Sequence, residues 1–116
     1  MKVTLDQALR RLPAAATEAY PEGAPSAVMM AGGTMQLKIF APGSNTDGLD
    51  RQQPHPQDEL YLVQRGTATL HIGDQRFDAA PGDVLFVAAG VDHRFEPFTD
   101  DFVTWVVFYG PNGGEA

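Results

Sequence analysis

The chain has 116 residues, 43% of them hydrophobic and 20% charged, which is the composition of one globular domain with its own core. Cysteine is absent, so a disulfide framework and thiolate chemistry are excluded and a reducing compartment is favoured. The formal net charge of −7 makes nucleic acid an unfavourable partner, because an acidic surface repels phosphate groups.

Residues 1–25 are predicted to form a short helix followed by an irregular arm. Thr4 and Gln7 have the spacing of a capping box, and apolar residues then recur at helical spacing from Leu5 to Leu12, until Pro13 interrupts the pattern. The N-terminal stretch lacks the apolar run of a secretory signal, and no segment reaches the roughly 20 apolar residues that span a bilayer. We therefore expect a cytoplasmic protein with no membrane partner.

Residues 26–110 are predicted to form a β-barrel or sandwich, because short β-branched and aromatic segments alternate with glycine and proline turns. The expected strands cover residues 26–31, 34–40, 59–65, 67–72, 75–79, 84–88, 93–96 and 102–109. Residues 111–116 are predicted to be a flexible tail. Because no repeat or linker is found, residues 1–116 are predicted to form a single all-β domain with one short helix.

Strand alternation places several polar residues on the interior face of this barrel. Gln53 and His55 face the same way if the chain there is extended, and Glu59 shares its face with Tyr61 and Val63. On a later strand His93 shares a face with Phe95, while Arg94 points outward. The pattern predicts that four polar side chains converge in an apolar interior: Gln53, His55, Glu59 and His93.

Two motifs give the chain a resemblance to a known family. The first contains Gln53, His55, Glu59 and Gly66. The second contains Pro81-Gly82-Asp83, Gly90 and His93. In spacing they are similar to the two signatures of small single-domain cupins, over about residues 34–109. The resemblance implies a jelly-roll β-sandwich, and it implies a homodimer, because such domains are commonly dimeric.

The resemblance also implies a metal site built from His55, Glu59 and His93. Gln53 stands where the family usually has a first histidine, so it is expected to be a weak ligand or to orient a bound water. Two histidines and a carboxylate suit Fe, Mn, Ni or Zn. Without a metal, the carboxylate of Glu59 would instead pair with His55 or His93, because an unpaired buried charge is costly. Ala88 and Pro97 replace other residues of the family pattern without touching the ligand set.

Aromatic side chains are expected to form most of the core, because they bury large areas. They are Tyr61, Phe86, Phe95, Trp105 and Phe108. Tyr61, Phe95 and Trp105 are the candidates for lining a pocket beside the polar cluster. His71 has no carboxylate spaced to assist it, so cross-strand packing or a surface position is expected. Leu60 and Leu62 point outward and require cover from the N-terminal arm or a partner subunit.

Two functions from different classes are compatible with these residues. The first is a metal-dependent enzyme, of dioxygenase, isomerase or lyase type, acting on a small oxygen-rich molecule in the barrel. The second is a non-catalytic module that binds or senses a small molecule or sugar, with a structural metal or none. Fold alone does not choose between them.

Overall fold

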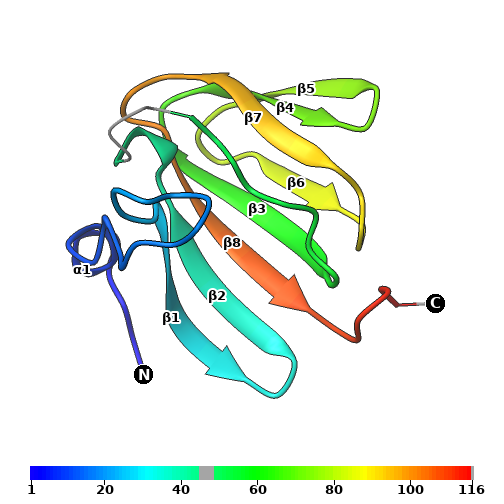
Figure 1. Cartoon of the computed structure of the whole chain (residues 1–116), viewed down its shortest axis with the longest axis horizontal. Helices are drawn as coiled ribbons and strands as arrows, with labels where there is room; N and C mark the ends of the chain where they lie inside the picture. Colours follow the sequence, from blue (N-terminus) through cyan, green and yellow to red (C-terminus); the bar gives the residue numbers. More distant parts are fainter. Residues whose placement is uncertain (45–48, 116) are drawn as a thin grey trace.

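A computed structural model describes residues 1–44 and 49–115, and it is a sandwich of antiparallel strands with one short helix (Figure 1). The helix α1 spans Leu5–Leu9, and a single 3-10 turn spans Pro42–Ser44. The strands are β1 (Ser26–Gly32), β2 (Met35–Phe40), β3 (Asp58–Arg65), β4 (Ala68–Ile72), β5 (Gln75–Ala79), β6 (Val84–Val87), β7 (His93–Phe98) and β8 (Val103–Tyr109).

The strands form two sheets that face each other across one core. The larger sheet has the order β1-β2-β8-β3-β6, the smaller one has the order β5-β4-β7, and the pairings between these strands are antiparallel. In Figure 1 the smaller sheet lies above the end of the larger one where β3 and β6 are found. The predicted all-β sandwich is confirmed, with strand ends within a few residues of those expected.

The core between the sheets follows the predicted alternation. Glu59, Tyr61 and Val63 on β3 are all buried, and on β7 His93 and Phe95 are buried while Arg94 is exposed. Tyr61 and Phe95 meet edge to face, with ring centroids 4.9 Å apart and planes at 84°, a favourable geometry for aromatic pairs. The interior is thus apolar around a few buried polar groups.

Helix α1 covers part of the outer face of the larger sheet. Its capping box is present, with Thr4 and Gln7 each bonded to the other's backbone N–H. The helix ends at Leu9, earlier than the predicted Leu12, because the N–H groups of Arg11 and Leu12 bond to carbonyls three residues back, as in a 3-10 turn. No helix in the described part of the chain is long and apolar enough to cross a membrane.

The uncovered part of that outer face is apolar. Leu60 on β3 lies opposite Phe86 on β6, and Leu62 lies opposite Val84. Val84 is 60% exposed and Phe86 is 57% exposed, so the prediction that Phe86 belongs to the core is wrong. The reason is strand parity: Leu85 and Val87 occupy the inward positions of β6. We call Leu60, Leu62, Val84 and Phe86 the outer apolar patch.

Gly66 ends β3 because its turn has room only for glycine. Its φ is +68°, and a Cβ atom there would overlap Thr99 Oγ1 and lie 2.8 Å from the Cα atom of Phe102. Both facts exclude a side chain at this position. The glycine that ends the first sequence motif is therefore required by the turn that carries the chain from one sheet to the other.

The C-terminal segment differs from the predicted flexible tail. The amide of Gly113 donates to the carbonyl of Pro56 at 2.7 Å, and the amide of Glu115 donates to Asp58 at 3.2 Å. Residues 111–115 therefore lie along the loop that leads into β3, with Gly113 and Gly114 at positive φ. The last residue, Ala116, lies outside the described residues.

Candidate functional site

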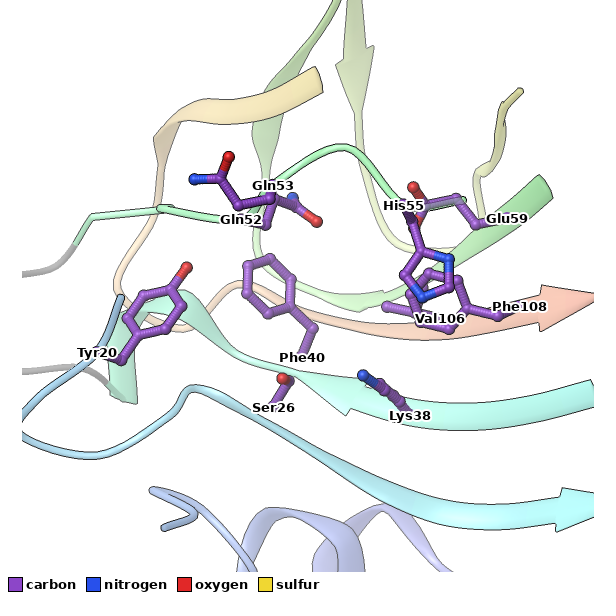
Figure 2. Close-up of a pocket in the computed structure, with 10 residues that line it drawn as sticks. All are labelled: Tyr20, Ser26, Lys38, Phe40, Gln52, Gln53, His55, Glu59, Val106 and Phe108. Carbon is purple, nitrogen blue, oxygen red and sulfur yellow. The ribbon is translucent and has the colours of Figure 1, made fainter. Parts of the chain in front are cut away.

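A cavity of about 190 Å³ opens between the inner face of the larger sheet and the loop that precedes β3. Figure 2 shows the side chains of Phe40, Val106 and Phe108 on one side of it and those of Gln52, Gln53 and His55 on the other. The lining residues are Tyr20, Ser26, Lys38, Phe40, Gln52, Gln53, His55, Glu59, Val106 and Phe108. A concave apolar site with a few polar groups is the usual form of a small-molecule pocket.

The buried end of this site is a carboxylate paired with an imidazole. Glu59 is 2% exposed and His93 is 3% exposed, and His93 Nε2 lies 2.8 Å from Glu59 Oε1. The second carboxylate oxygen, Glu59 Oε2, is buried and has no hydrogen-bond partner among the described residues. An unsatisfied buried oxygen is uncommon in native proteins and calls for a specific partner.

A chain of hydrogen bonds extends from this pair to the opposite sheet. The hydroxyl of Tyr61 lies 3.0 Å from His93 Nε2 and donates to Gln52 Oε1 at 2.9 Å. Gln52 Nε2 in turn donates to Asp50 Oδ2 at 2.7 Å, and the same oxygen accepts the backbone N–H of Phe95 at 2.8 Å. This chain links the loop before β3 to the free edge of β7.

The directions of these bonds determine the protonation of His93. Gln52 uses its amide nitrogen on Asp50, so its oxygen faces Tyr61 and the phenol must be the donor in that bond. The nitrogen Nε2 of His93 faces both Glu59 Oε1 at 2.8 Å and the Tyr61 hydroxyl at 3.0 Å, and His93 Nδ1 faces the carbonyl of Val91 at 2.9 Å. Both ring nitrogens face acceptors, which is the arrangement of an imidazolium paired with the Glu59 carboxylate.

Electrostatics agree with this assignment. Burial alone would lower the pKa of His93, but the hydrogen bond and negative charge of Glu59 outweigh it, so that pKa lies above its ordinary value of 6.5. Burial, reinforced by Glu59 and Asp50, raises the pKa of Tyr61 well above 10. Burial also raises the pKa of Asp50, against the opposing hydrogen bonds from Phe95 and Gln52. Tyr61 is therefore a neutral donor at physiological pH.

His55 lies on the rim and is held in a different way. Its ring stacks on Phe108, with centroids 3.8 Å apart and planes at 29° (Figure 2). Its Nδ1 accepts the backbone N–H of Gln57 at 3.2 Å, and its carbonyl accepts the N–H of Gly90 at 2.7 Å. Burial lowers the pKa of His55 and Lys38 lowers it further, against the opposing charge of Glu59. The ring is therefore neutral at pH 7, with its proton on Nε2.

The family of this fold is decided by the sequence match to a domain model. The model for the cupin domain matches residues 36–109, which include β2 to β8 and most of the cavity. The chain belongs to the cupin family. An uncharacterized protein of Streptomyces coelicolor is 38% identical to this cupin over 77 residues, which are 66% of the chain and 71% of that relative.

Solved cupin structures share the sandwich. A cupin 2 conserved barrel domain protein from Salinispora arenicola superposes with a TM-score of 0.58 at 20% identity, over 73% of this chain and 74% of that one. A cupin superfamily protein from Desulfitobacterium hafniense gives 0.55 at 21% identity, over 74% and 76%. A DMSP lyase from Ruegeria pomeroyi gives 0.56 at 17% identity, over 73% of this chain and 46% of its own. At such identities the likeness establishes the fold only.

The four residues of the predicted metal site are only partly brought together in this cupin. Glu59 and His93 are in contact, and the unpartnered Glu59 Oε2 suits a ligand atom. His55 and Gln53 line the same cavity, but the bond from Gln57 leaves the proton of neutral His55 on Nε2 and neither ring nitrogen free. Within residues 1–44 and 49–115, no three histidine or acidic side chains are grouped to hold a metal ion. In this arrangement Glu59 and His93 are placed to act as metal ligands, but no third protein ligand among the described residues is placed beside them.

The three aromatic candidates for pocket lining lie elsewhere. Tyr61 and Phe95 are fully buried behind the cavity, where Tyr61 supports His93 and Phe95 packs in the core. The prediction for Trp105 is wrong, because it packs with the residues beneath α1 on the outer face of the larger sheet. On β8 the inward positions are Thr104, Val106 and Phe108, and Trp105 has the opposite parity.

Sequence reasoning missed several residues of this site, among them the polar residues Lys38, Asp50 and Gln52. Alternation along β2 did not mark Lys38 as inward, because Met35, Leu37 and Ile39 form the more apolar face and Lys38 lies with Gln36 and Phe40 on the other. Asp50 and Gln52 lie in an irregular segment with no periodicity, so no pattern pointed to their contacts. His71 is placed as expected, away from Glu59, with Nε2 2.7 Å from the carbonyl oxygen of Glu96.

Proposed function

We propose that this cupin binds a small molecule in the cavity in front of the Glu59–His93 pair. The observation that carries the proposal is that Glu59 lines the cavity and that its buried oxygen Oε2 has no hydrogen-bond partner among the described residues. A ligand that donates a hydrogen bond to this oxygen removes the cost of leaving it unsatisfied. The function is that of a binding or sensing module, and it requires no metal.

The size of the cavity restricts the ligand. Pockets for drug-sized molecules measure about 300–1,000 Å³, whereas this one is about 190 Å³. A small metabolite with a compact apolar body therefore fits, lying on Phe108, Val106 and Phe40. The hydrogen-bonded chain behind the site holds Glu59 and His93 in place before the ligand arrives, which reduces the entropic cost of binding.

A thermal-shift screen of small metabolites in the presence of EDTA tests this function. A ligand at 100 times its Kd is expected to stabilise the protein by about 2.7 kcal/mol, which raises Tm by several degrees for a domain of this size. Ser26→Leu, which fills part of the cavity, is expected to abolish the shift, whereas Gln75→Leu on the exposed edge strand β5 retains it. Shifts that Ser26→Leu leaves unchanged would contradict binding in this cavity.

A second candidate function is a metal-dependent enzyme of dioxygenase, isomerase or lyase type. It is favoured by the contact between Glu59 and His93, which brings a carboxylate and an imidazole within reach of one ion. The ion would be Fe, Mn, Ni or Zn, with His55 or Gln53 as further ligands after rearrangement. Metal analysis of untagged protein and of its His93→Ala variant separates the two functions: only the enzyme requires near-stoichiometric metal that the variant loses.

We also propose that the protein is a homodimer that buries the outer apolar patch. Val84 and Phe86 are more than half exposed, and α1 covers only the β1, β2 and β8 side of the same face. Light scattering coupled to size exclusion is expected to give twice the chain mass of 12.5 kDa. Phe86→Glu is expected to give the monomer, because charge is costly in an apolar interface. The matched control is Phe77→Glu, at an exposed phenylalanine of the smaller sheet.

A further inference from the structure

We propose that the ligand of this cavity is a small organic anion, whose carboxylate pairs with Lys38 while a hydroxyl or amino group of the same molecule donates to Glu59 Oε2. The inference rests on the proposed small-molecule function and specifies its ligand class. It begins from a lysine on the inner face of a β-sheet, where charged side chains are uncommon.

Lys38 projects into the cavity from the centre of β2. It shares the inward face with Phe40, and its cross-strand neighbours are Val28 on β1 and Val106 on β8, so the sheet supplies no acidic partner. Figure 2 shows Lys38 among the residues that line the pocket, on the β2 side, and Nζ lies 5.2 Å from the centre of the Phe108 ring. Among the described residues, no carboxylate forms an ion pair with this ammonium.

The charged groups around the cavity leave Lys38 available to pair with an anionic ligand. Glu59 is the acidic residue of the lining, and its charge is already paired with His93 at 2.8 Å. His55 is neutral because Nδ1 accepts from Gln57, so it does not compete for an anion. Lys38 therefore makes the mouth of the cavity locally positive on a protein whose net charge is −7. A partly buried ammonium without a carboxylate partner gains a charge-assisted hydrogen bond when a carboxylate binds.

The two ends of the cavity then select two different groups. The Lys38 end requires an acceptor with negative charge, and the Glu59 end requires a donor. Between them, Phe108, with His55 stacked on it, forms an aromatic wall for the apolar body of the ligand. A hydroxy acid or amino acid of small size meets the three conditions, whereas a neutral sugar leaves Lys38 without a counter-charge.

The test compares acids with neutral molecules of the same skeleton. Glycolate, 3-hydroxypropanoate and 4-hydroxybutyrate are titrated into the protein at pH 7 with EDTA, alongside their methyl esters, and Kd is obtained from backbone amide shifts of the cavity residues. At least one acid is expected to bind roughly tenfold or more tightly than its ester, which is the effect of one charge-assisted hydrogen bond. Lys38→Met is expected to remove the difference, and Lys38→Arg is expected to retain most of it.

The chain offers a matched control, because its two lysines are Lys2 and Lys38. Lys2→Met is expected to leave the preference for acids unchanged. In protein whose lysines carry ¹³C-methyl groups, the NMR chemical shift of the Lys38 methyl groups is expected to change when the acid is added and to stay constant when the ester is added. Equal binding of acid and ester, or a preference that survives Lys38→Met, overturns the anion class and leaves the cavity function intact. If neither acids nor neutral metabolites perturb the cavity residues, the proposed function itself fails.

Discussion

His93→Ala is expected to lower the free energy of unfolding by about 3–5 kcal/mol at pH 6, measured by urea denaturation in EDTA. The variant leaves the carboxylate of Glu59, which is 2% exposed, without its partner imidazolium. It also removes the group to which the hydroxyl of Tyr61 is bonded. The matched control is His71→Ala, whose single bond to the Glu96 carbonyl is near the surface, and its effect is expected to stay below about 1 kcal/mol.

The effect of His93→Ala is expected to depend on pH in one direction. The pKa of His93 in the folded protein lies above the value of 6.5 expected in the unfolded chain. The folded state therefore binds the proton more tightly, so this stabilisation is complete below pH 6.5 and is lost as pH rises through the folded pKa. The difference between wild type and variant should shrink between pH 6 and pH 9. A difference that grows over this range would contradict the ion pair.

A double variant separates the buried charge from the lost packing. Glu59→Leu combined with His93→Ala removes the carboxylate together with its partner, so no charge remains buried without compensation. Replacing both members of a buried pair is commonly much less costly than removing one. We expect the double variant to be more stable than His93→Ala alone, and the reverse order would show that the Glu59 carboxylate is not an uncompensated charge in the single variant.

Asp50→Ala is expected to destabilise the protein by about 3 kcal/mol, through the loss of three hydrogen bonds to one buried carboxylate. The donors are the backbone N–H of Phe95 at 2.8 Å, the backbone N–H of Gln52 at 3.1 Å and Gln52 Nε2 at 2.7 Å. Phe95 lies on β7, the edge strand of the smaller sheet, so its amide has no strand partner on that side. Urea denaturation of the variant measures the loss.

Asp83→Ala is the control for Asp50→Ala. Its carboxylate also accepts a backbone N–H, from Ala80 at 2.9 Å, but it lies in an exposed turn where water replaces the lost bond. A loss below about 1 kcal/mol is expected there. Loss of the Gln52 contact should also free the hydroxyl of Tyr61, so ligand binding should weaken in Asp50→Ala. Equal stability of the two variants would indicate that Asp50 does not support the site.

The sequence by itself determined the features that depend on local spacing. Alternation along β3 and β7 predicted that Glu59 and His93 face the interior and that Arg94 faces outward, because side-chain direction in a strand has a period of two residues. The motif spacing likewise predicted the cupin sandwich and the turn at Gly66. The same spacing grouped Gln53 and His55 with His93. Of these three residues, Gln53 and His55 line the described cavity.

Only the tertiary structure decided which faces are covered and which distant groups touch. Trp105 and Phe86 both belong to apolar strands, but packing of α1 covers the first while the second remains exposed. Asp50 meets Phe95 across 45 positions of sequence, through a loop that carries no periodic signal. Likewise, Lys38 lines a cavity only because the folded sheet and the loop before β3 enclose one. Such contacts depend on sheet register and loop path, which many residues determine jointly and no short pattern encodes.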